Sequence, residues 1–323
     1  MRALPPRDIA MAADGVNMRF STTSWNSGLG KLELIPRNPE LDPTTGQTKQ
    51  PVDQRIYCSG GAFYDRSAGS AEYHPAHNHV HYNDYANYIL EQDTTSPQNP
   101  RKGVKTTFCI MDTTGVNTQV AGAAGASVFS LCPTQDPDFN KQGMSVGWGD
   151  TYGYTLAGQS LYVADLTPGM YRLRHVFDPK DTLLETTNGD NESCRKIEIG
   201  DGSNGRYVAD RGPCAALPTP RVDSVTPAQA KHNTCVNMTI NGANLAPELR
   251  INFTGGTGPL PAAKSLKIDT AGNYIQATVC VPKAKGSKNN PQLGSDPVWD
   301  VLVSATFGGY PAVTKANLFR VTK

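Results

Sequence analysis

The chain has 323 residues, a formal net charge of +1, 18% charged residues, 31 Gly and 24 Pro. This balanced charge gives no electrostatic footprint for a nucleic acid or an acidic membrane surface. No apolar run approaches the roughly 18 to 20 residues that a membrane span needs. Many short runs rich in Val, Thr, Tyr and Ile lie between turn residues, a pattern typical of β-sandwiches. We therefore expect an all-β protein, and its length predicts two domains.

In chain order, the first strands are predicted at residues 17–28 and 30–38, with a turn-forming Asn-Ser-Gly run between them. Residues 38–54 are polar and predict an excursion from the sheet. Residues 82–92 favour either a short helix or a bulged strand, and both interpretations stay open. Residues 105–115 predict a strand that ends in a turn.

Residues 161–179 alternate apolar and polar residues on both sides of a Thr-Pro-Gly turn, which predicts a hairpin. A proline-marked joint follows at residues 215–221. We therefore predict a first domain at residues 1–217 and a second at residues 218–323.

Four of the six histidines lie within eight residues: His74, His77, His79 and His81. The last three alternate, so in an extended segment their imidazoles leave one face and can converge on a transition metal. At about 3.3 Å per residue the outer two Cα atoms would lie roughly 13 Å apart, so the segment must bend or twist. Three imidazoles favour copper or zinc over magnesium or calcium. The alternative is a solvated polar strand.

Two further motifs carry a lysine and a tyrosine, Lys105 in GVKTTFC and Tyr152 in GWGDTYGY. A copper ion beside a tyrosine can oxidise the phenol with dioxygen to a quinone, to which a nearby amine can add. Lysine suits this step because burial and a neighbouring cation lower its pKa. Taken alone, Lys105 would be a solvated strand lysine and Tyr152 a core tyrosine.

Together these motifs resemble the lysyl oxidase family, copper amine oxidases that carry a lysine tyrosylquinone. The resemblance covers roughly residues 5–215 and includes RFSTTSWNSG near the start and PGMYRLRHVFDPKDTLLE downstream. It implies these site residues: His77, His79 and His81 for copper, and Lys105 and Tyr152 for the quinone. His74 would orient a ligand ring by hydrogen bonding. Asp150 is the candidate base for the substrate α-proton.

The chain departs from the animal members, which carry cysteines where it has Ala76 and where it has Trp148 or Gly149. In this respect it looks like the bacterial branch. The resemblance implies a primary amine, including peptidyl lysine, as substrate and dioxygen as oxidant.

A second metal site is implied in LLETTNGDNES, where the family's turn can hold calcium with an aspartate near the amino terminus. The implied ligands are Glu185, Asp190 and Asn191, with Asp8 as the distant partner. Thr187 stands where an aspartate is expected, so calcium affinity should be low or the site empty. The alternative is an Asx-rich turn.

The seven cysteines do not fit metal spacings such as C-x-x-C, so they favour disulfides. Family resemblance and proximity in sequence pair Cys194 with Cys214 and Cys109 with Cys132. Cys235 with Cys280 would lie inside the second domain, which leaves Cys58 over. Three disulfides indicate an oxidising compartment, so we expect secretion, although the amino-terminal residues lack the apolar core of a signal peptide.

The second domain opens with PRVDSVTP, followed by TINGANL and QATVCVP, and resembles the IPT/TIG type of immunoglobulin-like domain. We expect it to act in spacing or binding. The predicted architecture is thus a β-sandwich catalytic domain followed by an immunoglobulin-like β-sandwich.

The predicted function is copper- and quinone-dependent oxidative deamination of primary amines to aldehydes, with release of ammonia and hydrogen peroxide. The first alternative is a secreted metal-binding adhesion or scaffold protein that makes no quinone. A zinc hydrolase is the second, and it is disfavoured because no glutamate accompanies the histidines as a base.

Overall fold

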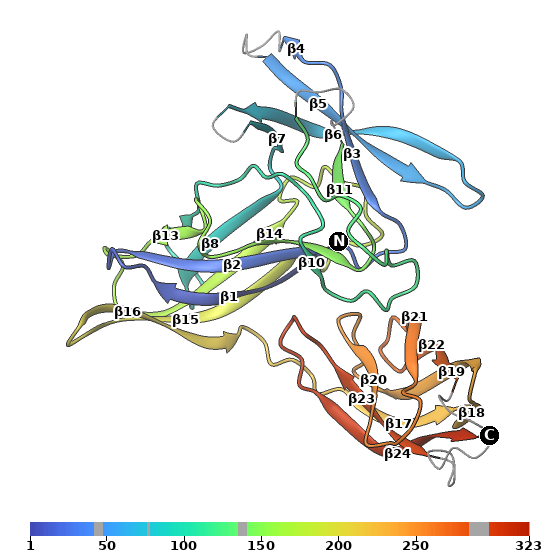
Figure 1. Ribbon diagram of the computed structural model, residues 1–323. Coiled ribbons are helices and arrows are strands. Elements are labelled where there is room, and N and C mark those ends of the chain that lie inside the picture. Colours follow the sequence, from blue (N-terminus) through green and yellow to red (C-terminus); the bar gives the residue numbers. More distant parts are fainter. Residues whose placement is uncertain (42–47, 76–77, 135–140, 284–296, 323) are drawn as a thin grey trace. The chain divides into compact units, whose positions relative to one another are not determined.

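The computed structural model, drawn in Figure 1, describes residues 1–41, 48–75, 78–134, 141–283 and 297–322, and these ranges contain strands but no helix. The all-β class predicted from the sequence is therefore confirmed. It follows that the described residues include no helix able to cross a membrane.

The chain divides into two compact units. The first unit consists of Met1–Gly115 and Ala124–Ala216, and the second of Val116–Ala123 and Leu217–Lys323. The sequence-based division placed Val116–Ala123 in the first domain, whereas the structure groups this segment with the second unit.

One sheet of the first unit has the strand order β1-β2-β12-β10, and β13 also pairs with β2. Its strands are β1 (Arg2–Met11), β2 (Asn17–Trp25), β10 (Thr114–Gly115), β12 (Trp148–Tyr152) and β13 (Ser160–Tyr162). Most side chains of β2 are buried, so both faces of this strand are covered. The middle of β2 carries small Ser and Thr side chains. Their hydroxyl groups hydrogen-bond to Tyr88, Thr151 and His175.

A second sheet has the order β16-β15-β14-β8-β9. Its strands are β8 (Ala86–Gln92), β9 (Arg101–Lys102), β14 (Gly169–Phe177), β15 (Glu192–Gly202) and β16 (Gly205–Pro213). The sequence left two predictions for residues 82–92, a short helix or a bulged strand. The structure has the strand β8 there, and its pairing with β14 has no bulge. The hairpin predicted at 161–179 is wrong, because β13 pairs with β2 whereas β14 pairs with β8 and β15. The Thr-Pro-Gly turn instead passes the chain between two sheets.

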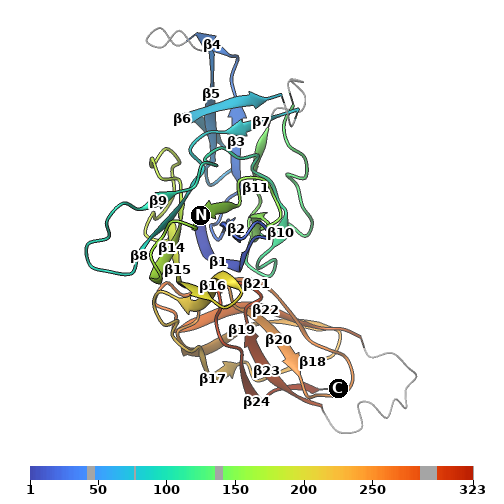
Figure 2. The ribbon, with the colours of Figure 1, turned by 90° about the vertical axis from the view of Figure 1, so that its left-hand side faces the viewer.

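The third sheet of this unit, seen from another side in Figure 2, has the order β11-β3-β5-β6-β7, with β4 paired to β5. Its strands are β3 (Leu32–Pro36), β4 (Glu40–Leu41), β5 (Thr48–Tyr57), β6 (Phe63–His74), β7 (His79–Tyr82) and β11 (Gln142–Met144). The polar residues 38–54, predicted as an excursion, include β4 and part of β5. The hairpin β6–β7 carries His74, His79 and His81.

The core of the first unit is rich in fully buried aromatic rings. Tyr88 packs edge-on against Phe20 and Phe108, with ring centroids 5.1 Å and 6.1 Å apart. Phe108 belongs to the region predicted as a strand at 105–115. Within that region only β10 is a strand, and Phe108 forms one isolated β-bridge with Tyr82. The two backbone hydrogen bonds between Phe108 and Tyr82 and the burial of the Phe108 ring hold this segment in the interior.

The second unit has two four-stranded sheets around a core of its own, β17-β19-β22-β21 and β18-β24-β23-β20. Its strands are β17 (Arg221–Thr226), β18 (Gln229–Lys231), β19 (Thr234–Ala243), β20 (Arg250–Thr254), β21 (Ala262–Ile268), β22 (Tyr274–Val281), β23 (Val298–Ser304) and β24 (Val313–Thr322). β20, β22 and β23 have inward apolar residues that alternate with more exposed ones, as expected for sandwich strands.

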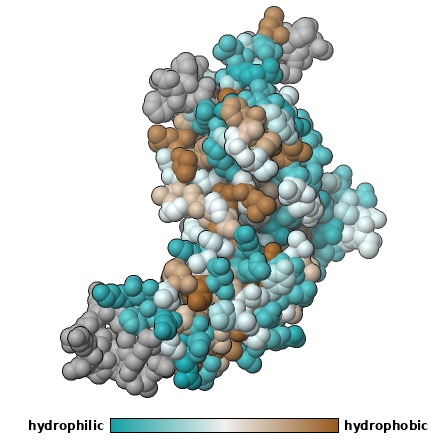
Figure 3. All heavy atoms as spheres, turned by 90° about the vertical axis from the view of Figure 1, so that its right-hand side faces the viewer, coloured by the Kyte–Doolittle hydropathy of each residue, from teal (hydrophilic) through white to brown (hydrophobic). Residues whose placement is uncertain are grey.

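The three predicted disulfides are confirmed: Cys109–Cys132, Cys194–Cys214 and Cys235–Cys280. Cys58 is free and exposed, as predicted. On the face drawn in Figure 3, apolar side chains form several patches separated by polar ones.

Candidate metal and quinone site

The histidine cluster lies where β6 ends and β7 begins. His74 pairs with His79 across this antiparallel hairpin, and the ring centroids of His74 and His81 are 5.0 Å apart. The Nε2 atoms of His79 and His81 are 2.9 Å apart. The side chains of His79 and His81 therefore lie close together on β7. His77, the third predicted ligand, lies outside the described residues.

The two described ligands fit a shared metal ion. Imidazole nitrogens bind such ions at about 2 Å, so two nitrogens of one site lie at most about 4 Å apart. His81 is buried, and its Nδ1 atom lies 3.2 Å from the Thr107 hydroxyl. With Nδ1 in contact with the hydroxyl, Nε2 is the atom of His81 that would bind the predicted metal. Within the described ranges, no three His, Cys, Asp or Glu side chains are grouped to hold an ion.

Lys105 and Tyr152 are neighbours in the folded chain. The Lys105 ammonium lies 5.1 Å from the centroid of the Tyr152 ring and 4.9 Å from that of Phe108. Phe108 meets Tyr152 edge-on at 4.7 Å, and the Tyr152 hydroxyl donates a 2.7 Å hydrogen bond to the Cys109 carbonyl. The lysine thus lies near a phenol ring that is held in one orientation.

Burial changes the acid–base properties of both groups. It lowers the pKa of Lys105, against the opposing charge of Asp150. It also raises the pKa of Tyr152 well above 10, and the charge of Asp150 adds to this rise. The lysine is therefore easier to deprotonate than in water, and the phenol harder.

Backbone hydrogen bonds join the histidine strand to the lysine segment. Tyr82, the last residue of β7, donates to the Phe108 carbonyl at 2.7 Å and accepts from the Phe108 amide at 3.0 Å. The amide of Tyr85 donates to the Thr106 carbonyl at 3.1 Å. Together with the contact between Thr107 and His81, these bonds connect the predicted metal ligands with Lys105.

Asp150 is buried on β12, opposite Ser24 of β2. Burial raises its pKa well above 3.8 and the nearby Asp112 adds to the rise, whereas a hydrogen bond from the Met111 backbone and the charge of Lys105 lower it. Its Oδ2 atom has no hydrogen-bond partner among the described residues. Asp150 is therefore a carboxyl group that can hold a proton near Lys105.

Asp112 has a different role, which the sequence did not reveal. Its carboxylate accepts hydrogen bonds from the backbone amides of Val128, Phe129 and Ser145 and from the Ser145 hydroxyl. These four bonds satisfy the charge of Asp112. We therefore assign it to holding the loops around the site.

The loop after Tyr152 packs on Lys105, which the sequence also did not reveal. Gly158 has a positive φ of +79°, and a Cβ atom there would lie 2.9 Å from the Lys105 Cβ. Arg19 donates to the backbone carbonyls of Tyr154 and Leu156 in the same loop. Glycine at position 158 thus leaves room for the lysine side chain.

The predicted calcium ligands have cationic or amide partners in this structure. Glu185 accepts from the amino group of Met1 and from Asn191, while Asp190 pairs with Arg2 at 2.8 Å. Asp8 pairs with its neighbour Arg7. Burial raises the pKa of Glu185. The carboxylates that would bind a calcium ion therefore already have other partners, which compensate much of their charge.

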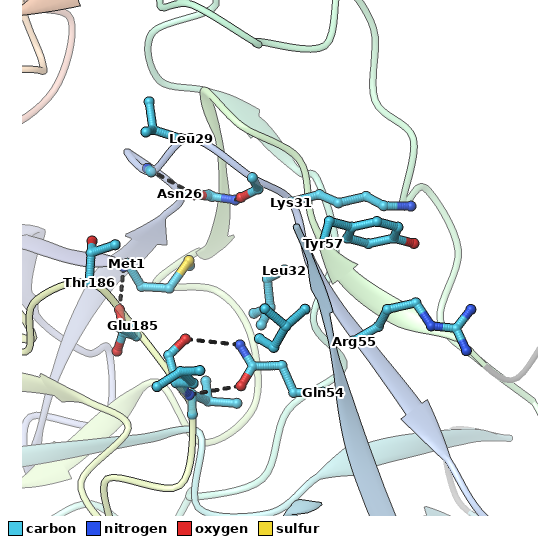
Figure 4. Close-up of a pocket in the computed structure, with 15 residues that line it drawn as sticks. Met1, Asn26, Leu29, Lys31, Leu32, Gln54, Arg55, Tyr57, Glu185 and Thr186 are labelled. Atoms are coloured by element: carbon cyan, nitrogen blue, oxygen red, sulfur yellow. Dashed lines mark hydrogen bonds and ion pairs between the residues drawn. The ribbon is translucent and has the colours of Figure 1, made fainter. Parts of the chain in front are cut away.

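Glu185 also lines a pocket between β3, β5 and the segment after Thr182, shown in Figure 4. Gln54 closes one side by bonding to both the amide and the carbonyl of Leu184, at 2.7 Å and 3.1 Å. Lys31 lies over the Tyr57 ring, 4.6 Å from its centroid. The described histidines, Lys105 and Tyr152 do not line this pocket.

Comparison with known proteins identifies similarity in the region that carries these residues. Residues 53–203 match the family model described as lysyl oxidase. Over 158 residues, or 48% of the chain, the sequence is 27% identical to lysyl oxidase homolog 1 from Homo sapiens and to its counterpart from Bos taurus. The match covers 25% of the human relative and 24% of the bovine one, so the chain spans about a quarter of these proteins. These findings show that residues 53–203 of this chain are similar to the lysyl oxidase family.

Proposed function

We propose that the protein is a copper-dependent amine oxidase of lysyl oxidase type, in which Lys105 and Tyr152 form a lysine tyrosylquinone. One observation carries the proposal: the Lys105 ammonium lies 5.1 Å from the Tyr152 ring centroid, although 47 positions separate the two residues in the sequence. The backbone bonds between the histidine strand and the lysine segment support a single site.

His77, His79 and His81 would hold the copper ion. With its quinone, such a site oxidises a primary amine, so that amine, dioxygen and water give an aldehyde, ammonia and hydrogen peroxide. Both Lys105 and Tyr152 are partly exposed, which would let an amine substrate reach the site. The proposed substrate is a primary amine, with peptidyl lysine as one candidate.

The roles of the protein residues follow from their surroundings. Lys105 provides an amine whose lowered pKa favours the neutral, nucleophilic form. The hydrogen bond from Tyr152 to the Cys109 carbonyl orients the phenol ring for attack. Asp150 would accept the substrate α-proton, because a carboxylate with a raised pKa is a stronger base. Thr107 would orient His81, with His74 packed beside that ring.

The decisive experiment loads the full chain with copper in air and seeks a cross-linked peptide joining residues 105 and 152 by mass spectrometry. Peroxide release with simple primary amines is measured in parallel. Lys105→Ala and Tyr152→Phe should each abolish the cross-link and the turnover while copper remains bound. His79→Ala should instead abolish stoichiometric copper.

The exposed neighbours Lys102 and Tyr154 offer matched controls. Lys102→Ala and Tyr154→Phe should keep both cross-link and turnover. A fully metallated wild-type protein that shows neither would favour the metal-binding scaffold instead.

Three further assignments belong to the same proposal. We propose secretion, because three disulfides suit an oxidising compartment. We propose that residues 218–323 form an IPT/TIG-like domain, on the sequence motifs and the two-sheet architecture. Calcium binding by Asp8, Glu185, Asp190 and Asn191 stays a proposal of weak affinity, to be tested by calorimetric titration with calcium.

A further inference from the structure

The segment Val116–Ala123 connects two parts of the first unit but folds with the second. It lies in the sequence between Lys105 and Tyr152, the two proposed quinone precursors. Val116 and Asn117 are buried, with exposed fractions of 1% and 0%. The segment is therefore an integral part of the second unit.

Two amide side chains hold the segment there. Asn117 donates from Nδ2 to the carbonyls of Pro247 at 2.7 Å and Leu249 at 2.9 Å. Gln119 donates from Nε2 to the Ile251 carbonyl at 3.0 Å and accepts from the Ile251 amide at 2.8 Å. The Gln119 side chain thus pairs with β20 as a neighbouring strand's backbone would. We call Asn117 and Gln119 the amide pair.

Backbone contacts extend this arrangement to β21. The Leu266 amide donates to the Gln119 carbonyl, and the Ala121 amide donates to the Leu266 carbonyl, each at 2.8 Å. Val120 forms a parallel bridge with Leu266. Hydrogen bonds from its backbone and from its side chains therefore hold the segment within the second unit.

Both ends of the segment continue into the strand neighbourhood of Tyr152. Before it, Thr114 and Gly115 form β10 and pair with Gly149 and Trp148 of β12. After it, the Ala124 carbonyl accepts a 2.9 Å hydrogen bond from the Trp148 indole. Because β12 ends at Tyr152, the two ends of the segment bracket the strand that carries the proposed quinone precursor.

We propose that the second unit has a positioning role in the amine oxidase site, exerted through the amide pair. By holding Val116–Ala123, it fixes β10 and the backbone at Ala124, and through them β12 and the Tyr152 ring. This inference rests on the proposed function for its catalytic meaning. Its structural part, that the amide pair orders β12, stands separately and is measured separately.

The test uses the full chain with Asn117→Ala and Gln119→Ala combined. Hydrogen exchange should become faster in peptides covering 113–124 and 148–152, by about tenfold or more, because four side-chain hydrogen bonds are lost. Exchange in β22, which does not contact the amide pair, should stay unchanged. At equal copper content, the yield of the peptide joining residues 105 and 152 should fall severalfold.

The matched control is Asn237→Ala with Thr278→Ala, which removes an exposed hydrogen bond between β19 and β22 of the second unit. It should leave exchange at 148–152 and the cross-link yield unchanged. If the double variant of the amide pair fails to fold, Gln119→Ala alone removes two of the four hydrogen bonds and should give a smaller change in the same direction.

Unchanged exchange at 148–152 in a variant with faster exchange at 113–124 would overturn the proposal, as would an unchanged cross-link yield. If the wild-type protein forms no cross-link, the proposed function fails. In that case the exchange of residues 148–152 alone decides whether the amide pair orders β12.

Discussion

Lys105 is the residue whose surroundings constrain the proposed chemistry most. Its ammonium lies near the rings of Phe108 and Tyr152, and the stem of its side chain lies against Gly158. Burial lowers its pKa, while the carboxyl group of Asp150 acts against this change. Burial thus destabilises the charged ammonium form of Lys105 and favours the neutral, more nucleophilic amine.

Gly158→Ala is expected to disturb this placement. The new methyl group would lie 2.9 Å from Lys105 Cβ, and the φ of +79° would cost roughly 1–2 kcal/mol for a residue with a Cβ atom. The variant should bind copper normally but give much less of the cross-linked peptide, measured by mass spectrometry. Gly153→Ala is the matched control, because nothing lies within 4 Å of a Cβ atom there. Equal yields in the two variants would contradict the packing argument.

His175 should make the first unit sensitive to acid. It is 1% exposed, and burial lowers its pKa from 6.5 to about 4 against the opposing effect of the hydrogen bond to the Leu4 carbonyl. Between these values the unfolded chain binds more protons, so stability rises with pH and is lost as the pH falls from 6.5 towards 4. A difference of about 2.5 pKa units corresponds to about 3 kcal/mol.

Urea unfolding at pH 7 and pH 4.5 measures this effect. The wild-type chain should lose about 2–3 kcal/mol more than His175→Gln over this range. His232→Gln, in the second unit, should behave as the wild type does. Equal acid sensitivity of His175→Gln and the wild type would show that His175 does not cause the loss.

At the scale of elements, the sequence predicted the strands better than their partners. The alternation in residues 169–177 correctly indicated a strand, because one side of β14 faces the core. Pairing of that strand with β8 and β15 depends on contacts far apart in sequence, which a local pattern does not contain. The predicted hairpin at 161–179 failed for this reason.

The histidine hairpin gives a second example. Alternation of His77, His79 and His81 indicated a metal site, and the structure places the Nε2 atoms of His79 and His81 2.9 Å apart. The neighbours of the histidines were not predictable, since Thr107 reaches His81 only because Phe108 pairs with Tyr82. Gly158 and Asp112 were missed for the same reason: their contacts lie far away in sequence.

At the scale of the whole molecule, each unit has its own buried core, yet the chain passes between the units three times. The proline-marked joint near Leu217 predicted only the last of these passages. The other two, at the ends of Val116–Ala123, leave little signal, because polar Asn and Gln side chains in a loop usually indicate solvent exposure. Their burial depends on acceptors about 130 positions later.

This arrangement predicts that weakening the second unit also weakens the first. The disulfide Cys235–Cys280 joins β19 and β22, two strands of the second unit. Replacing both cysteines by serine should lower the stability of the second unit by about 2–4 kcal/mol. When that unit opens, Asn117 and Gln119 lose their partners and the strand carrying Tyr152 loosens. On warming, this variant should therefore show faster exchange at 148–152 and less cross-linked peptide at temperatures where the wild type shows neither change. If exchange rises in β19 and β22 but stays unchanged at 148–152, the two units are energetically independent despite the shared segment.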